Sequence, residues 1–317
     1  MTPIFIFSLP RSGSTLLQKL LMTHPSICST SEPWFLLPLL GSFQRDFHVS
    51  LYSSVNARKA YFDLVKQLDG GEDEFRKALA NMIMRIYKGL SKNDEFFFLD
   101  KTPRYYLIID EIVKMFPNAK LIFLFRNPVS IMSSIISFFG GNRLTSFHNY
   151  DIDLELGTKF LAEGWQKYGH KSIRVSYEDL TLGPGDELNK VFHYIGLETP
   201  REALTNFSNS VLTGQLGDKV GENVKEVRSS RILIKTNWIR KKYILHKLSK
   251  MNSQSLLVCG YVKDELILEV KAQESQFNFN MIRDIKDIIS SWLKKKLKLQ
   301  LFFSKSIHGN LRRHHLS

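Results

Sequence analysis

The sequence has few cysteines, no long apolar segment and fewer acidic than basic residues. Only two cysteines occur among 317 residues, which argues against a disulfide framework and against a cysteine-rich metal site. No stretch approaches the roughly 18 apolar residues of a membrane-spanning helix. The apolar run at residues 4–7 is too short for the core of a secretory signal, and no basic segment precedes it. We therefore expect a soluble, cytoplasmic protein.

The overall composition is that of an ordinary globular chain. Hydrophobic residues make up 43% of it and charged residues 24%, which excludes disordered and collagen-like classes. A chain of this length can bury a sizeable core, as one large domain or as a domain with a smaller appendage.

The excess of positive charge is concentrated in the last third of the chain. The formal net charge is +13, of which residues 225–250 contribute +8 and residues 281–317 contribute +7, so the remainder is close to neutral. Basic segments attract anions, and an anionic membrane, an anionic glycan and a merely solvated surface all remain open. No zinc-finger spacing and no recognisable nucleic-acid module occurs, so we expect no nucleic-acid partner.

Strands and helices are predicted to alternate along the first 200 residues. Apolar, β-rich segments are followed by helical patterns, and this order is typical of a parallel sheet covered on both faces. Asn127 and Pro128 supply a helix cap and a first-turn proline. The predicted strands cover residues 3–7, 121–125 and 172–177, and the predicted helices cover residues 16–24, 106–115, 129–138 and 186–195.

The loop after the first predicted strand has the features of a phosphate-binding loop. Small residues lead directly into a helix start, where the backbone N–H groups of residues 12–16 and the helix dipole favour an anion. Ser14 and Thr15 add hydroxyl donors, and Arg11 adds a cation that can form bidentate hydrogen bonds to an anion. The alternative is a purely structural turn.

This loop is not a Walker A loop. Ser14 occupies the place of the Walker lysine, and the cation lies before Gly13 instead of after it. The strand at 121–125 ends in Arg126, whereas a Mg²⁺-dependent nucleotide enzyme needs an acid there. We therefore predict a metal-free site in which arginines neutralise the anion.

Together these segments resemble the sulfotransferases that use 3′-phosphoadenosine 5′-phosphosulfate (PAPS). The resemblance runs from residue 3 to about residue 200, and its motif spacing is most similar to the tyrosylprotein sulfotransferase-like branch. It rests on several motifs in the right order: Pro10-Arg11-Ser12-Gly13-Ser14-Thr15-Leu16, His24-Pro25, Asp100-Lys101-Thr102-Pro103, Arg126-Asn127-Pro128 with Ser134, and residues 174–180. It implies a P-loop NTPase-like parallel β-sheet flanked by helices, over residues 1–265, with a basic, mostly helical C-terminal extension over residues 266–317.

The resemblance also implies the residues that bind PAPS and its product PAP. Arg126 and Ser134 would hold the 3′-phosphate, although Ser130 and Ser133 compete with Ser134 on the residues alone. Tyr177 matches a position that contacts the nucleotide, and Lys101 is expected to add a second cation at the reacting group. The 5′-phosphosulfate would lie on Arg11, Ser12, Gly13, Ser14, Thr15 and Leu16.

Glu32 is the predicted catalytic base. It lies 21 residues after Arg11, in the Ser31-Glu32-Pro33-Trp34 segment, and the resembling branch places its glutamate at this spacing. A carboxylate near the loop can accept the proton of the acceptor group. The alternative bases are His24, His48, His148 and His170.

Two features depart from the family pattern. Arg104 follows Pro103 where many relatives have histidine. The glycine-containing segment at 213–219, with Gly214 and Lys219, matches the family's later 3′-phosphate loop in its glycines but lacks the basic pair of that loop. Segments 35–95 and 138–165, where we expect the acceptor to bind, match nothing specific.

The sequence therefore predicts a sulfotransferase that moves a sulfuryl group from PAPS to a hydroxyl or amine of an unidentified acceptor, such as a carbohydrate, a lipid or a small metabolite. One alternative is an ATP-dependent small-molecule kinase, in which Asp100 is the candidate ligand for Mg²⁺. Another is a non-catalytic nucleotide-binding protein at a membrane. The apolar stripe of the predicted helix at 279–293 either lies on an anionic membrane or packs on the domain.

Overall fold

The computed structural model describes residues 1–41, 54–138, 144, 147–214, 217, 227, 237–275 and 280–296. Several predictions fall outside them. These are most of the basic segment before residue 237, the basic tail after residue 296, His48 and Lys219.

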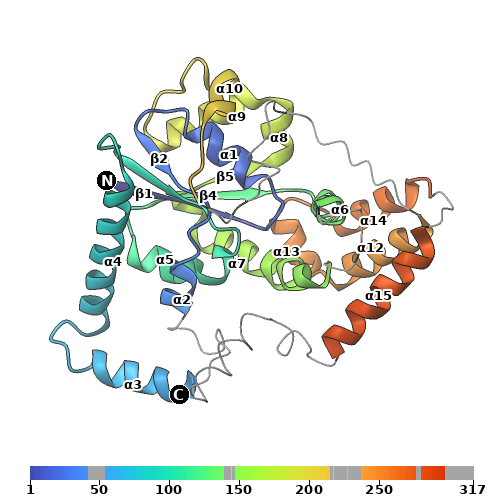
Figure 1. The fold of residues 1–317 in the computed structure, drawn as a ribbon, viewed down its shortest axis with the longest axis horizontal. Helices are drawn as coiled ribbons and strands as arrows, with labels where there is room; N and C mark the ends of the chain where they lie inside the picture. The colour runs from blue at the N-terminus through green and yellow to red at the C-terminus, as the bar shows by residue number, and fades with distance from the viewer. Residues whose placement is uncertain are drawn as a thin grey trace.

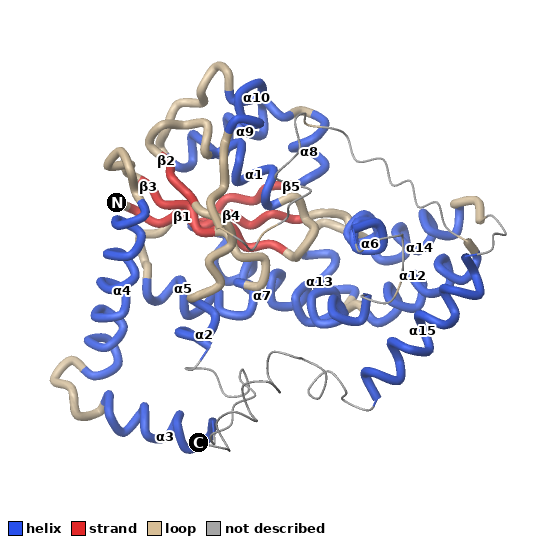
Figure 2. The backbone as a smooth tube through the Cα atoms, viewed as in Figure 1, coloured by secondary structure: helices blue, strands red, loops and turns tan. Residues whose placement is uncertain are grey.

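The centre of the molecule is a five-stranded, all-parallel sheet with the order β2-β3-β1-β4-β5 (Figure 2). The predicted α/β class and parallel sheet are confirmed. Three of the strands were predicted, whereas β2 and β3 are too short for their pattern to be recognised. The strands are β1 (Thr2–Ser8), β2 (Ile27–Ser29), β3 (Phe97–Asp100), β4 (Lys120–Phe125) and β5 (Ser172–Ser176).

Helices cover both faces of this sheet (Figure 1). Their apolar residues fall into two separate clusters, one on each side of the sheet. One face carries α1 (Ser14–Leu21), α8 (Tyr177–Leu182), α9 (Pro184–Ile195) and α10 (Ala203–Asn206). The other carries α2 (Leu36–Gly41), α5 (Ile109–Met115), α6 (Pro128–Phe138), α7 (Thr158–Tyr168) and α13 (Ser253–Val258). Short turns of helix lie at Tyr105–Ile108, Phe147–Tyr150, Asp153–Gly157, Gly169–Lys171 and Phe207–Asn209.

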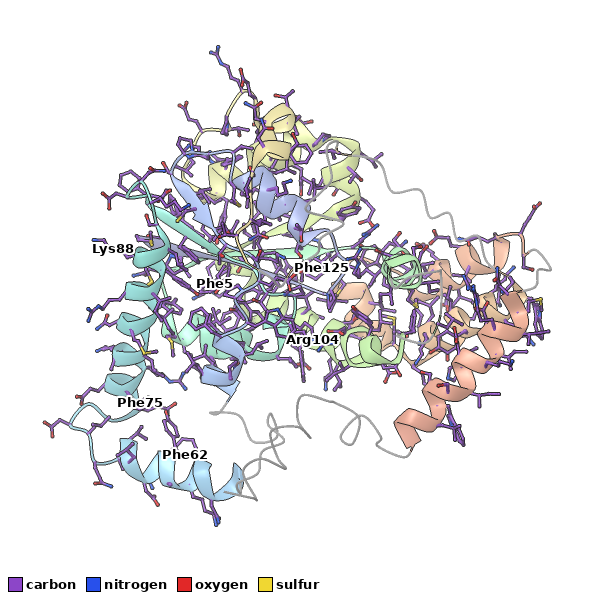
Figure 3. The ribbon with its side chains drawn as sticks, in the orientation of Figure 1. Phe5, Phe62, Phe75, Lys88, Arg104 and Phe125 are labelled. Carbon is purple, nitrogen blue, oxygen red and sulfur yellow. The ribbon has the colours of Figure 1, made fainter. Side chains whose placement is uncertain are left out.

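Alternation along the central strand builds the two clusters. Ile4 and Ile6 face the leucines of α1, whereas Phe5 and Phe7 face the opposite cluster with Phe125 (Phe5 and Phe125 are labelled in Figure 3). All of these side chains are almost fully buried. A strand buried on both faces needs apolar residues at every position, which is why β1 and β4 have near-continuous apolar sequences.

Further helices extend from two opposite sides of the sheet (Figure 1). On one side lie α3 (Ser54–Val65) and α4 (Gly71–Leu90), and on the other lie α12 (Trp238–Lys250), α14 (Lys263–Ala272) and α15 (Asn280–Lys296). The boundary expected at residue 265 falls within α14 and stays a prediction. Among the described helices, none combines the length and apolar character needed to cross a bilayer.

Candidate functional site

Every strand of the sheet leads into one of the predicted site residues. Glu32 follows β2, Lys101 follows β3, the loop with Arg11 follows β1, Arg126 follows β4, and Tyr177 follows β5. The strands are parallel, so their carboxyl ends meet at one edge of the sheet. Residues separated by up to 166 positions are therefore gathered at that edge.

The loop after β1 presents backbone donors at the start of α1. Helix α1 begins at Ser14, and no side chain caps it, so the N–H groups of its first turn have no partner within the helix. The Ser12 hydroxyl is buried with no hydrogen-bond partner among the described residues. The Leu16 side chain is buried in the core, so only its backbone belongs to the site. An anion is the ligand that suits these donors.

Gly13 is required by the packing of Tyr177 against the loop. Its φ is +88°, and a Cβ at this position would lie 2.2 Å from Cδ2 and Cε2 of the Tyr177 ring. Any side chain at residue 13 would push the ring away from the loop.

We expect Gly13→Ala to disturb both stability and nucleotide binding. The left-handed backbone and the clash with Tyr177 are together expected to cost about 1–3 kcal/mol in the free energy of unfolding. Thermal unfolding and titration with PAP measure the two effects. Gly89→Ala in α4, where a Cβ meets nothing within 4 Å, is the matched control. It is expected to leave PAP affinity unchanged and to raise stability by at most about 1 kcal/mol, because alanine favours a helix over glycine. Wild-type PAP affinity in Gly13→Ala would contradict the role of this contact.

Arg126 is fixed between the loop and Tyr177. Its guanidinium carbon lies 4.0 Å from the centre of the Tyr177 ring, and its Nη1 donates to the backbone oxygen of Arg11 at 2.7 Å. Arg11 in turn donates from Nε to Ser134 Oγ at 3.2 Å. Burial lowers the pKa of Arg126, and its Nε has no hydrogen-bond partner among the described residues. A half-buried guanidinium of this kind suits an anionic ligand.

The helix cap directly after Arg126 is as predicted. Asn127 caps α6 with its side-chain oxygen, which accepts the N–H of Val129 at 2.8 Å and that of Ser130 at 3.3 Å. Ser134 lies on the same helix and bonds Arg11.

Glu32 and Lys101 form a buried ion pair beside the loop. Lys101 Nζ donates to Glu32 Oε1 at 2.8 Å and to Thr15 Oγ1 at 3.2 Å. The lysine side chain is 1% exposed and the glutamate side chain 10%. Trp34 Nε1 donates to Glu32 Oε2 at 3.1 Å. Both carboxylate oxygens are therefore oriented, one by a cation and one by an indole.

A cavity of about 240 Å³ opens in front of this pair. Arg11, Gly13, Ser14, Thr15 and Glu32 line it together with residues to which the sequence gave no role in binding or catalysis: Pro10, Trp34, Pro103, Arg104, Tyr150 and Gly217. The lining thus joins charged groups to two aromatic side chains, a combination suited to a small organic ligand.

Arg104 is held rigidly at the wall of this cavity (labelled in Figure 3). Its Nε and Nη2 donate to the two oxygens of Asp153 at 3.0 and 2.9 Å. The Tyr106 hydroxyl donates to Asp153 as well, at 2.6 Å. The sequence drew attention to Arg104, because it replaces the histidine of many relatives. No sequence feature indicated its partner Asp153, which lies 49 residues away.

The segment around Gly214 packs against the end of β2. The backbone oxygen of Thr213 accepts the Ser31 N–H at 2.9 Å and the Thr30 hydroxyl at 2.6 Å. A Cβ on Gly214, whose φ is +135°, would lie 2.8 Å from the Ser31 side chain. This segment therefore helps to position the strand that leads to Glu32.

Of the alternative bases, His24 belongs to a turn. Its Nδ1 accepts the Ser26 N–H at 3.0 Å, and burial lowers its pKa. His170 lies exposed before β5. His48 and the side chain of His148 are outside the described part of the chain.

Asp100, the candidate Mg²⁺ ligand of the kinase alternative, faces the core. It is fully buried, and its Oδ2 accepts hydroxyl bonds from Tyr87 at 2.5 Å and Tyr105 at 3.0 Å. Burial raises its pKa to about 7, against the lowering effect of the two tyrosine hydroxyls and of Lys101. This surrounding differs from the exposed, ionised carboxylate that a metal needs.

We expect Asp100 to make the protein less stable as pH rises towards neutrality. The folded state holds this proton up to about pH 7, whereas the unfolded carboxyl releases it near its ordinary pKa of 3.8. The unfolded state therefore binds fewer protons in this window, and the Asp100 contribution falls by about 2–3 kcal/mol between pH 5 and pH 7.5. Urea unfolding of wild type and Asp100→Asn measures it. The variant is expected to lack this fall, and identical pH profiles would contradict the assignment.

The sequence comparisons agree on one family. A model described as the sulfotransferase family matches residues 3–201. Nodulation protein NoeE of Sinorhizobium fredii is 32% identical over 215 residues, which cover 61% of this chain and 50% of that protein. Protein-tyrosine sulfotransferase A of Caenorhabditis elegans is 23% identical over 205 residues, with the same coverage of 61% and 50%. The chain thus spans half the length of each of these two relatives.

A solved structure has the same fold. The sulfotransferase domain of the Synechococcus PCC 7002 olefin synthase superposes with a TM-score of 0.51 at 23% identity, covering 82% of this chain and 94% of that one. At this identity the likeness concerns the fold alone, and it extends beyond residue 201 into the C-terminal third.

Proposed function

Because this chain belongs to the sulfotransferase family, we propose that it transfers a sulfuryl group from PAPS to a hydroxyl or amine group of an acceptor. The observation that carries the proposal is the position of the Glu32 carboxylate. It lies beside the anion-binding loop, in contact with Lys101, and it lines the cavity in which an acceptor has room to bind.

The donor binds along the edge of the sheet in this proposal. The first-turn amides of α1 and Arg11 hold the 5′-phosphosulfate, and Arg126 with Ser134 holds the 3′-phosphate. Tyr177, which stacks on Arg126, contacts the nucleotide. Arg126 and the loop are already connected through the backbone of Arg11, so the two phosphate sites are preorganised relative to each other.

The reaction is an in-line displacement at sulfur. The acceptor oxygen or nitrogen forms a bond to sulfur while the bond from sulfur to the 5′-phosphate oxygen breaks, and PAP leaves with that oxygen. Glu32 takes the acceptor proton. Lys101 and Arg11 stabilise the charge that develops on the departing phosphate. The cavity wall with Trp34, Arg104 and Tyr150 holds the acceptor in line.

The kinase alternative loses the residue on which it depended. Asp100 is surrounded by tyrosines in the core, and Glu32 is paired with Lys101.

Calorimetric titration of the wild-type protein tests the proposed donor. We expect PAP to bind in EDTA at micromolar or tighter affinity, because its phosphates meet arginines and backbone amides instead of a metal. ATP with Mg²⁺ is titrated in parallel. Binding of ATP with Mg²⁺ but not of PAP would overturn the proposal and favour a kinase.

A further inference from the structure

Helix α15 packs with its acidic side inward. Asp284 and Asp287 are 0% and 1% exposed. Arg240 of α12 donates from Nε and Nη2 to the two oxygens of Asp284, both at 2.8 Å, and Asn237 Nδ2 donates to the same carboxylate at 2.6 Å. Asp287 accepts the backbone N–H of Leu144 at 3.1 Å. These bonds fix the rotation of the helix about its own axis.

The opposite side of α15 is apolar and exposed. Five large side chains on it are between 42% and 66% exposed: Ile282, Ile285, Ile289, Trp292 and Leu293. At helical spacing they fall within an arc of about 100°. The sequence left open whether this stripe packs on the domain. Only Ile288 of the described stripe lies against the core, and the rotation set by Asp284 turns these five residues outward.

Helix α12 continues this exposed surface. Trp238, at the start of α12, is 52% exposed, and Lys242 Nζ lies 4.0 Å from the centre of its ring. A groove of about 520 Å³ between the two helices is lined by Trp238, Lys242, Ile285 and Trp292. We call Trp238, Lys242 and the five apolar residues of α15 the α12/α15 face. Figure 1 shows α15 at the outer edge of the molecule, beside α12 and away from the sheet.

Basic residues lie close to this face in the sequence and, for Lys242 and Lys286, in the structure. Helix α15 ends in Lys294, Lys295 and Lys296, and Lys286 is exposed one turn after the first apolar residue. In sequence, the segments that contain the two helices carry the whole excess charge, +8 over residues 225–250 and +7 over residues 281–317. An exposed face of Trp, Ile and Leu with lysines beside it matches a partner whose anionic surface layer covers an apolar interior.

We propose that the α12/α15 face docks on an anionic phospholipid bilayer, with α15 lying in the plane of the interface. Its 17 residues span about 25 Å. The isoleucines and Leu293 enter the acyl boundary, Trp238 and Trp292 lie at headgroup depth, and the lysines contact the headgroup phosphates. Membrane contact is independent of the sulfuryl-transfer site, which lies at the carboxyl ends of the strands.

Two other occupants fit this face less well. A second copy of the chain would bring two strongly basic segments together, and like charges across an interface oppose association. An acidic glycan would pair with the lysines but would leave the five apolar side chains in water. Charge and apolar area together favour the bilayer.

Sedimentation of the full chain with lipid vesicles tests the proposal. We expect binding to vesicles made of equal parts phosphatidylcholine and phosphatidylglycerol, little binding to phosphatidylcholine alone, and weaker binding in high salt. The triple variant Ile285→Glu, Ile289→Glu, Trp292→Glu is expected to bind these vesicles at least about tenfold more weakly than wild type. The matched control Ile86→Glu, Phe96→Glu, Leu182→Glu changes three residues that are 43%, 71% and 75% exposed elsewhere, and it is expected to bind like wild type.

The remaining outcomes overturn the proposal. Equal vesicle binding by the two triple variants would show that the α12/α15 face is not the docking surface. Absence of vesicle binding by wild type, together with a dimer in analytical ultracentrifugation that the α15 variant dissociates, would assign the face to a second copy. Retention on heparin without binding to vesicles would assign the charge to an acidic glycan. Titration with PAP and circular dichroism check that each variant is folded.

Discussion

Glu32→Gln is expected to lower kcat by about 10²–10⁴ while the affinity for PAP stays within about threefold of wild type. The amide cannot take the acceptor proton, but it has the size of the carboxylate. Its oxygen can still accept a hydrogen bond from Lys101, which in the wild-type structure donates to Glu32 Oε1 at 2.8 Å. PAP release is measured with an acceptor found by screening hydroxyl and amine compounds against radiolabelled PAPS, and the PAP dissociation constant is measured by calorimetry.

A second acid–lysine pair, in which the carboxylate is buried and the lysine is exposed, supplies the control for this experiment. Glu187 is 5% exposed and accepts from Lys190 at 3.0 Å on α9, a helix on the same face of the sheet as α1. Glu187→Gln is therefore expected to affect stability without affecting turnover. Unchanged turnover in Glu32→Gln would remove Glu32 as the base, and absence of turnover in wild type despite tight PAP binding would support a non-catalytic nucleotide-binding protein.

Arg126→Gln is expected to weaken PAP binding by about 10–100-fold, because a charge-assisted contact to phosphate is worth about 1.5–3 kcal/mol. The loss is expected to exceed that single contact if the Arg11 loop shifts, since Arg126 Nη1 holds the backbone oxygen of Arg11 at 2.7 Å. Calorimetric titration in EDTA measures it. Arg126→Lys distinguishes charge from geometry, because lysine keeps the charge but loses the planar stack on Tyr177.

Arg174 is the matched control for Arg126. It also stacks on an aromatic ring, with its guanidinium carbon 4.3 Å from the centre of Phe125, and it donates to the backbone oxygens of Val258 and Cys259. It connects β5 to the C-terminal end of α13, whereas Arg126 donates to the loop at Arg11. Arg174→Gln is expected to lower thermal stability and to leave PAP affinity unchanged. An equal loss of affinity in both variants would indicate a general structural effect.

The elements that were predicted correctly are those encoded within one short stretch of sequence. The loop at 10–16 can be recognised because strand, small residues and helix follow one another directly, and the same holds for the cap at Asn127. Strands β2 and β3 were missed because three or four residues carry too little pattern. Both strands matter for the site, since Glu32 and Lys101 follow them.

By itself the sequence determined the α/β class, the parallel sheet and the residues at the ends of its strands, because alternation of short local patterns is enough to order these elements. Only the tertiary structure decided how those residues pair. Glu32 forms an ion pair with Lys101, the Tyr177 ring packs against Gly13, and Arg104 donates hydrogen bonds to Asp153. The apolar stripe of α15 faces outward because Arg240 buries Asp284 on the other side of the helix. Such contacts join residues far apart in the chain, and their geometry depends on the packing of the whole fold.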